Sequence, residues 1–281
     1  KQIKNQLKLL SQNLNYNQDT FFFLSKNFEL DFTSQDISKF KRFQTIVILG
    51  IGGSILGSKA IYNFFQSKIK KNILFFDNLD SSNIQKETKK INFKKSLFVI
   101  ISKSGNTLET LSMINLLKNK KINKKNAIVI TERKNSPLSN FCRKFNILMI
   151  EHKKYIGGRY SVLSEVGMLP AYLMGLNIKR FRKNTFHILE KNKNILMKIL
   201  PTMLKIYSSK KYSAIVFLNY SPRLDNFLFW LQQLIAESLG KKGKGLLPVI
   251  STTPKDHHSL LQLYLDGPKD KIFYFLSEKV L

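Results

Sequence analysis

Short apolar runs of strand length alternate with segments of helical spacing over the first 150 residues. The apolar runs cover residues 45–49, 72–76, 96–101, 127–131 and 147–150. The helical segments between them cover residues 54–66, 81–90, 108–117 and 137–145. This alternation predicts an α/β fold with a doubly wound parallel sheet. Ligands of such sheets bind beyond the carboxyl ends of the strands, so the residues that follow Leu49 and Ile101 are candidates for a site.

A second series of the same kind follows a long helical connection over residues 179–207, in which Pro201 is the interruption. Its strands and helices are expected over residues 212–218, 223–239, 246–250, 255–265 and 272–276. We therefore predict two domains: an N-terminal extension with a first α/β domain over 1–176, and a helical connection with a second α/β domain over 177–281. The last strand ends five residues before the chain does and the first residue is not Met, so we expect a fragment whose second domain is truncated.

The first predicted strand leads into a glycine-rich turn at residues 50–57. The turn is not a dinucleotide fingerprint, because Ile55 stands where the third glycine is required, and it lacks the Gly-Lys-Ser/Thr of a P-loop. Ser54 is expected to begin the next helix, where it can both cap that helix and meet an anion. A helix cap without any ligand is the alternative interpretation.

The turn after residues 96–101 is the more specific signal. It reads Ser102-Lys-Ser-Gly-Asn-Thr-Leu-Glu-Thr110, with four hydroxyls in nine residues. Hydroxyls and free backbone N–H groups at the positive end of a helix are suited to a phosphate, and Lys103 can add a charge. The alternative is an ordinary polar loop.

Two charged residues elsewhere are candidates for chemistry. Arg159 follows Gly157 and Gly158, and its guanidinium can stabilise a developing oxyanion or form a surface salt bridge. Glu237 lies in an otherwise apolar helical segment, with Gln233 and Trp230 one and two turns before it. That carboxylate is either polarity at a helix end or a general base.

The histidines and the cysteine do not predict a metal site. His257 and His258 are adjacent, so on a helix they point about 100° apart and make a poor chelating pair. One of them is a candidate proton shuttle, and capping at a helix start is the alternative. A single cysteine, Cys142, excludes an intramolecular disulfide and favours a reducing compartment. We expect no metal and no cofactor.

The net charge of +29 raises the question of nucleic acid binding. Lysine outnumbers arginine 40 to 7 and is spread along the whole chain, whereas nucleic acid readers rely on clustered arginine. We therefore expect no nucleic acid partner. No window approaches 18 uninterrupted apolar residues, and the N-terminus does not have the pattern of a signal peptide, so we expect no membrane span and a cytoplasmic location.

Taken together, these segments resemble the phosphoglucose isomerase family. The motifs at residues 50–57, 102–110, 157–164, 237–240 and 253–267 occur in the family's order. The turn at 102–110 is shared by sugar-isomerase-type (SIS) phosphosugar-binding domains in general. The Gly-Gly-Arg-Tyr-Ser and Glu-Ser-Leu-Gly-Lys motifs are more specific than this turn, and together they favour the isomerase. The resemblance implies two SIS-type units and an aldose–ketose isomerase of glycolysis and gluconeogenesis, which interconverts glucose 6-phosphate and fructose 6-phosphate through a cis-enediol.

The resemblance also implies a role for each candidate residue. Glu237 is expected to carry the proton between C2 and C1, and Arg159 to stabilise the enediolate. His258 is expected to assist ring opening from the neighbouring subunit of a homodimer. The residues expected to line the sugar and phosphate pocket are Gly53, Ser54, Ser102, Lys103, Ser104, Thr107, Thr110 and Gln233.

One feature departs from the family pattern, because nothing after His258 matches the lysine near the family's C-terminus that takes part in ring opening. Two alternatives stay open at this point. One is a non-catalytic phosphosugar-binding protein with an SIS domain, and the other is a dual phosphoglucose/phosphomannose isomerase.

Overall fold

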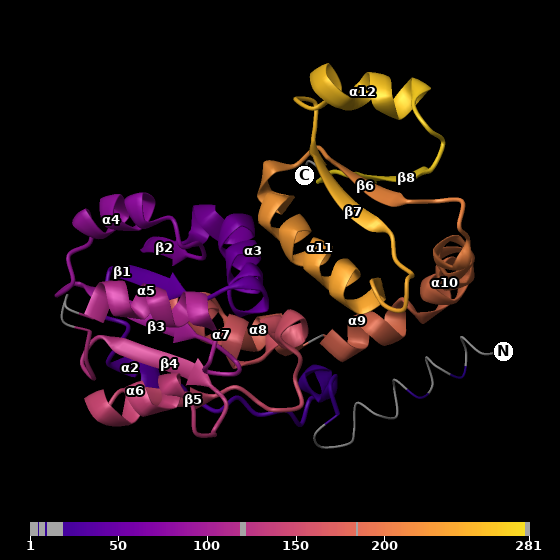
Figure 1. Ribbon diagram of the computed structural model, residues 1–281. Helices are drawn as coiled ribbons and strands as arrows, with labels where there is room; N and C mark the ends of the chain where they lie inside the picture. The colour runs from indigo at the N-terminus through magenta and orange to yellow at the C-terminus, as the bar shows by residue number, and fades with distance from the viewer. Residues whose placement is uncertain (1–4, 6–8, 10–18, 119–121, 184, 279–281) are drawn as a thin grey trace.

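The computed structural model describes residues 5, 9, 19–118, 122–183 and 185–278 (Figure 1). The first unit is built on a five-stranded parallel sheet with the order β2-β1-β3-β4-β5. Its strands are β1 (Thr45–Leu49), β2 (Asn72–Phe76), β3 (Ser96–Ile101), β4 (Ala127–Thr131) and β5 (Leu148–Glu151). This confirms the predicted doubly wound sheet, with β5 one residue further along the chain than expected. The strand order reverses between β1 and β3, and that is where ligands of such sheets bind.

Helices cover both faces of this sheet, because successive side chains of a strand point to opposite faces. Val47 and Leu49 belong to one core, and Ile46 and Ile48 belong to the other. The helices of the first core are α4 (Ser81–Lys89), α5 (Leu108–Lys118) and α6 (Pro137–Phe145). Those of the second core are α2 (Ser34–Ser38), α3 (Leu56–Phe65) and α7 (Glu165–Leu173). Every residue of β3 and β4 is buried, as expected for a sheet with two covered faces.

Three helices connect the two units: α8 (Ile178–Lys183), α9 (Thr185–Lys191) and α10 (Lys193–Ser208). Pro201 lies inside α10, so the helix continues through the position where an interruption was expected. Ile178 and Phe181 pack against the core of the first unit, whereas Ile206 packs against the second. The change of unit therefore takes place within this connection, and the division between residues 176 and 177 stays a prediction.

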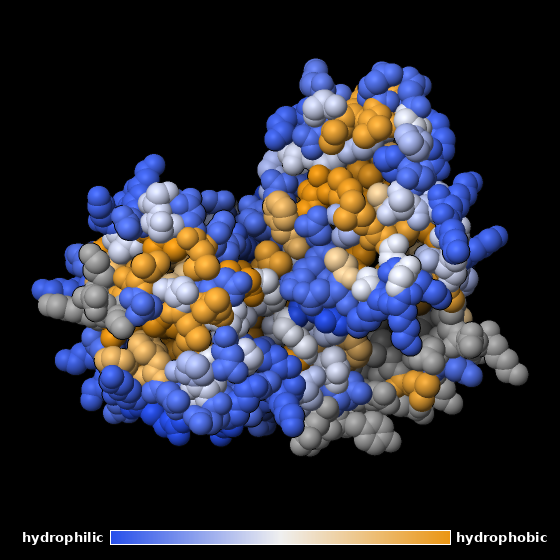
Figure 2. Space-filling view, viewed as in Figure 1, coloured by the Kyte–Doolittle hydropathy of each residue, from blue (hydrophilic) through white to orange (hydrophobic). Residues whose placement is uncertain are grey.

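The second unit contains a three-stranded parallel sheet with the order β7-β6-β8. Its elements are β6 (Ala214–Asn219), α11 (Asp225–Leu239), β7 (Leu247–Thr252), α12 (His257–Asp266) and β8 (Lys271–Leu276). Helices α11 and α12 lie on opposite sides of the sheet (Figure 1). The central strand β6 is buried throughout, but Leu247 and Phe275 of the outer strands are 67% and 72% exposed. Apolar side chains accordingly gather at the surface of this unit as well as over part of the first (Figure 2).

Short 3-10 turns complete the described fold: η1 (Phe22–Leu24), η2 (Gly52–Ser54), η3 (Gln66–Lys68), η4 (Gly158–Leu163) and η5 (Pro222–Leu224). Two of them, η2 and η4, pack against each other, and α11 of the second unit contacts both of them as well as α3. The second unit is thus held beside the carboxyl end of β1 in the first.

Candidate active site

The turns η2 and η4 of the first unit lie in direct contact, and glycine makes this contact possible. A Cβ atom on Gly53 would stand 2.4 Å from the carbonyl carbon of Gly158 and 2.7 Å from the backbone nitrogen of Arg159. Gly52 has φ 54°, a left-handed conformation that favours glycine. Within η4, the hydroxyl of Ser161 donates to the carbonyl oxygen of Gly158 at 2.6 Å. The turn η2, which follows β1, therefore packs directly against η4, the turn that carries Arg159.

Ser54 does not cap the following helix. It is the last residue of η2, and α3 begins at Leu56 with Ile55 in the N-cap position and no side-chain cap. The capping role expected for Ser54 was wrong, because an additional 3-10 turn moves the start of the helix along the chain. Gly53 and Ser54 remain in the turn that faces η4 and α11.

Arg159 and Glu237 meet across the two units. The Nη1 atom of Arg159 lies 3.3 Å from Oε2 of Glu237, and its Nε donates to the hydroxyl of Ser238 at 2.9 Å. The guanidinium also lies over the ring of Tyr160, 4.5 Å from its centroid. The Arg159 side chain is 20% exposed and that of Glu237 is 48% exposed. A fixed cation thus stands beside a carboxylate that solvent or a ligand can reach.

Two neighbours on α11 hold this pair in place. Gln233 donates from Nε2 to Oε1 of Glu237 at 2.7 Å, and Trp230 donates from Nε1 to the carbonyl oxygen of Arg159 at 3.0 Å. Gln233 also lies against Gly52, where an added Cβ would be 3.0 Å from Nε2. The predicted set of Arg159, Gln233 and Glu237 is therefore together in one place, and Trp230 joins it.

The turn at 102–110 leads from β3 into α5. Ser102 is buried, and its Oγ lies 2.8 Å from Oγ1 of Thr107 and accepts the N–H of Gly105 at 3.2 Å. Ser104 accepts the N–H of Asn106 at 3.1 Å. Gly105 has φ 68°, and a Cβ there would collide with the hydroxyl of Ser136 at 2.2 Å. The turn is therefore held in one conformation by its own hydroxyls and by the loop after β4.

Several donors of this turn have no acceptor among the described residues. Over the part of the chain that the structure describes, the backbone N–H groups of Lys103, Ser104 and Thr107 donate to no protein atom. The hydroxyl of Thr110 is buried without a partner. The first turn of α5 also leaves N–H groups free, since the start of any helix does so. Such donors at the positive end of a helix are suited to binding an anion.

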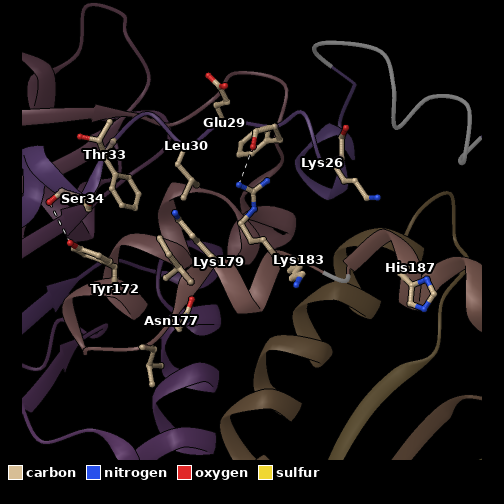
Figure 3. A pocket seen from close by; sticks show the side chains of 16 residues that line it. Lys26, Glu29, Leu30, Thr33, Ser34, Tyr172, Asn177, Lys179, Lys183 and His187 are labelled. Atoms are coloured by element: carbon tan, nitrogen blue, oxygen red, sulfur yellow. Dashed lines mark hydrogen bonds between the residues drawn. The ribbon is translucent and has the colours of Figure 1, made fainter.

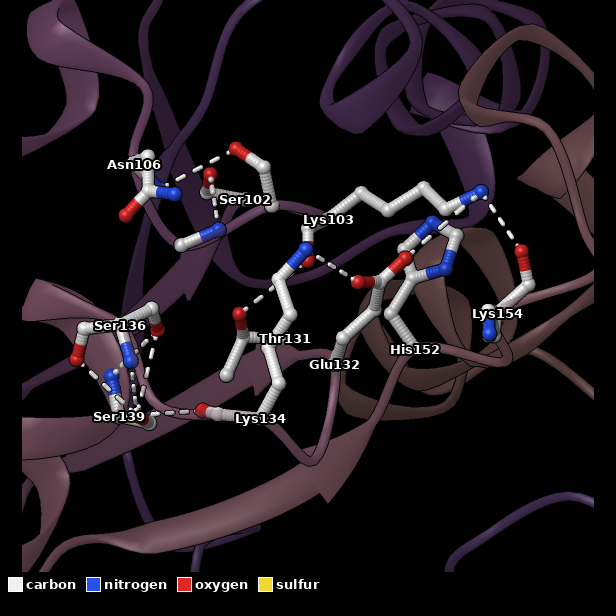
Figure 4. A network of polar contacts seen from close by, with 12 residues as sticks. Ser102, Lys103, Asn106, Thr131, Glu132, Lys134, Ser136, Ser139, His152 and Lys154 are labelled. Carbon is white, nitrogen blue, oxygen red and sulfur yellow. Dashed lines mark hydrogen bonds and ion pairs between the residues drawn. The ribbon is translucent and has the colours of Figure 1, made fainter.

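The Lys103 side chain turns away from these donors (Figure 4). Its ammonium donates to the carbonyl oxygens of Lys154 at 2.9 Å and Ile156 at 2.8 Å, and lies 3.8 Å from Oε1 of Glu132. Burial lowers the pKa of the Lys103 ammonium, Glu132 raises it, and the charge of Lys134 lowers it.

His258 stands apart from the other candidates. It is exposed in the first turn of α12, which lies on the other side of the second sheet from α11 (Figure 1). Its neighbour His257 lies 3.4 Å from the hydroxyl of Tyr220 through Nε2. The structure therefore does not bring His258 to Arg159 and Glu237 within one chain.

Two buried ionisable groups near the site were not found from the sequence. His152 is 1% exposed directly after β5, and burial lowers its pKa to about 4 although the Lys153 carbonyl raises it. Glu165 is fully buried at the start of α7, and burial raises its pKa although its bond from the Asp31 N–H at 3.0 Å lowers it. His152 directly follows β5, so its position at the carboxyl end of a parallel strand was the sequence signal that could have marked it as a site candidate.

Two hollows accompany these residues. One, of about 480 Å³, lies beside Glu237 and Gln233 and has Phe229 and Leu247 in its apolar wall. A wider groove of about 1360 Å³ lies between residues 25–34 and α8, with Lys26, Lys179, Lys183 and His187 around it (Figure 3). None of the sequence-predicted site residues lines the wider groove, whereas Gln233 and Glu237 line the first hollow.

Metal and membrane features are absent from the part of the chain that the structure describes. No group of three or more His, Cys, Asp or Glu side chains there could hold a metal ion. No helix among those residues is both long enough and apolar enough to span a bilayer.

Comparisons with known proteins point to one family. The family model of phosphoglucose isomerase matches residues 26–250. Glucose-6-phosphate isomerase of Methanocaldococcus jannaschii is 36% identical over 258 residues, which cover 87% of this chain and 63% of that protein. The chain thus spans less than two thirds of the length of this relative.

Solved structures show the same likeness. A hypothetical protein of Thermus thermophilus superposes with a TM-score of 0.82 at 26% identity, over 99% of this chain and 70% of that one. A glucose-6-phosphate isomerase of Chlamydia trachomatis superposes with a TM-score of 0.71 at 25% identity, over 86% of this chain and 52% of that one.

Proposed function

The chain belongs to the phosphoglucose isomerase family, and we propose that the protein containing it interconverts glucose 6-phosphate and fructose 6-phosphate through a cis-enediol. The observation that carries this proposal is the pairing of Arg159 with Glu237 in a chain that also has unpaired donors in the turn after β3. A phosphate-binding protein needs the turn alone, whereas an isomerase also needs a base and a cation. We propose no metal and no nucleotide in the reaction.

The phosphate is held by the turn at 102–110 in this proposal. The hydroxyls of Ser102, Ser104, Thr107 and Thr110 donate to it, together with the backbone N–H groups of the turn, including that of Lys103. Gly53 and Ser54 line the same side of the pocket. Binding the phosphate fixes the distance from the sugar carbons to Glu237, which is how a remote group contributes to the rate.

Glu237 then moves one proton between neighbouring carbons. It takes the proton from C2 of the open-chain aldose as the C2–H electrons form the C1–C2 double bond of the enediolate and O1 takes up the negative charge. A proton then passes from the hydroxyl at O2 to O1, and Glu237 returns its own proton to C1 as the C2–O2 bond becomes the carbonyl of the ketose. The oxygen that gains negative charge is stabilised by the guanidinium of Arg159. Gln233 orients the carboxylate through its bond to Oε1.

We further propose a homodimer in which His258 of a second copy assists ring opening. Two observations support it: His258 is exposed and remote from Glu237 within one chain, and the hollow beside Glu237 has Phe229 and Leu247 exposed in its wall. We also propose that the protein is cytoplasmic, where its sugar phosphates would be metabolised.

The exchange of one hydrogen tests the chemistry. In heavy water, the full-length protein should incorporate deuterium at C2 of glucose 6-phosphate. Glu237→Gln keeps the shape and removes the base, so isomerisation and exchange should fall by roughly 10²–10⁴-fold while phosphate affinity stays the same. Phosphosugar binding without any exchange by the unmodified protein would favour a non-catalytic regulator. Equal turnover of mannose 6-phosphate would make it a dual isomerase.

Mixed dimers test the placement of His258. Subunits with Glu237→Gln and subunits with His258→Ala are each expected to be impaired on their own. If His258 acts across the interface, a random mixture regains about a quarter of the activity, since half of the dimers contain one intact site. Mixtures that regain nothing would place His258 in its own subunit's site or outside any site.

A further inference from the structure

Lys103 links the phosphate turn to the segment that carries Arg159. Its backbone is fixed at the end of β4, because the carbonyl oxygen of Lys103 accepts the N–H of Glu132 at 3.1 Å. From there its side chain runs away from Ser102 and Asn106 and reaches the backbone at Lys154 (Figure 4). The backbone of Lys103 therefore belongs to the turn at 102–110, and its ammonium binds the loop after β5.

The loop that receives the ammonium ends three residues later at Arg159. Over the described part of the chain, the carbonyl oxygens of Lys154 and Ile156 accept a hydrogen bond from the Lys103 ammonium and from no other donor. The Ile156 side chain is fully buried, so the loop is fixed on its other face by an apolar contact. Residues 154–156 are therefore held by one apolar contact, through Ile156, and by the two hydrogen bonds from the Lys103 ammonium.

We propose that Lys103 is a positioning residue, whose ammonium holds residues 154–156 and thereby keeps Arg159 against Glu237, while the phosphate is bound by the hydroxyls and N–H groups of the turn. This inference rests on the proposed function for its catalytic part.

The donors of the ammonium argue against direct phosphate binding by this side chain. An ammonium has three N–H donors. Two point at the carbonyl oxygens, and the side that remains faces Glu132 at 3.8 Å. To reach an anion in the turn, Lys103 would leave both carbonyls without their donor. Water can replace it at the exposed Lys154 carbonyl, but the Ile156 carbonyl is partly buried, where an unpaired polar group is unfavourable. The ammonium therefore stays with the loop when phosphate binds.

Lys103→Met in the full-length protein tests the proposal against Lys134→Met. Lys134 pairs with the same carboxylate, at 2.6 Å from Oε2 of Glu132, but among the described residues its ammonium donates no hydrogen bond to the carbonyl oxygens of Lys154 or Ile156. For Lys103→Met we expect kcat to fall at least tenfold, with KM and the affinity for inorganic phosphate within threefold of the parent. Amide hydrogen exchange over residues 154–160 should accelerate, and Lys134→Met should change none of these quantities.

Other outcomes overturn the proposal. A weakened affinity for inorganic phosphate with an unchanged kcat would make Lys103 a phosphate ligand, and an unchanged kcat with unchanged exchange would leave it no positioning role. If Lys103→Met does not fold, Lys103→Arg replaces it: a guanidinium that donates to both carbonyls should keep kcat within threefold, and a tenfold loss there would contradict the proposal. Should the unmodified protein isomerise nothing, the proposed function fails, while the exchange and phosphate measurements still decide the role of Lys103.

Discussion

The two units follow the same strand-helix pattern but bury their sheets to different degrees. All six residues of β3 in the first unit are buried, whereas none of the six in β8 of the second unit is. The first sheet has a core on each face, and the second has one cluster around Ile215, Phe217 and Leu228. The turn at 102–110 is therefore positioned by buried strands, while Glu237 is positioned by contacts of α11 with the other unit.

The largest effect should come from deleting a side chain in the better-buried sheet. Ile100 is fully buried, so Ile100→Ala should lower the free energy of unfolding by roughly 2–5 kcal/mol through lost burial and a cavity. Phe275 is 72% exposed, and Phe275→Ala should stay within about 0.5 kcal/mol. Urea unfolding of both variants measures the difference. Equal losses would show that the two sheets are buried alike.

The contact between η2 and η4 offers a second test, within the first unit. Gly53→Ala places a Cβ against backbone atoms that cannot rotate away, so we expect a loss of about 3 kcal/mol in unfolding free energy. Gly158→Ala is the matched control, because a Cβ there meets no atom within 4 Å. Thermal and urea unfolding give the comparison. A neutral Gly53→Ala would mean that the two turns are not in contact.

The buried His152 should make the first unit sensitive to acid. Its folded pKa of about 4 lies below the unfolded value of 6.5, so the unfolded state binds the proton more readily between these values. Stability is therefore complete above pH 6.5 and is lost as the pH falls toward 4, by about 2 kcal/mol at pH 5. His152→Gln should remove this component from the difference between urea unfolding at pH 7 and pH 5. An unchanged difference would place the histidine in water.

Much of this arrangement could be predicted from the sequence, for physical reasons. The strands of the first sheet are short apolar runs that alternate with helical spacing, and only β5 was displaced, by one residue. The glycines and hydroxyls at 50–57 and 102–110 marked the ends of β1 and β3, which topology brings to the switch point. The proximity of Gln233 and Glu237 followed from their helical spacing, whereas that of Arg159 followed from the family resemblance alone.

What could not be predicted depends on long-range geometry. The hydrophobic periodicity of the sequence did not predict the 3-10 turn η2, after which α3 begins only at Leu56. That turn depends on the packing of Gly53 against Gly158, which are far apart in the sequence. The direction of the Lys103 side chain depends on where the loop after β5 lies. Pro201 was expected to interrupt a helix, but α10 continues through it in a place where proline usually bends or ends a helix.

The smallest expected effect on stability concerns the ion pair that joins the two units. Arg159 and Glu237 are 3.3 Å apart and Glu237 is half exposed, so solvent screens their attraction. A double-mutant cycle with Arg159→Met and Glu237→Gln should give a coupling of less than about 1 kcal/mol in the free energy of unfolding. The same substitutions should each reduce isomerisation by orders of magnitude. If the coupling instead reached several kcal/mol, the pair would serve to hold the units together. A weak coupling leaves the packing of α11 on α3 as the main attachment between the two units.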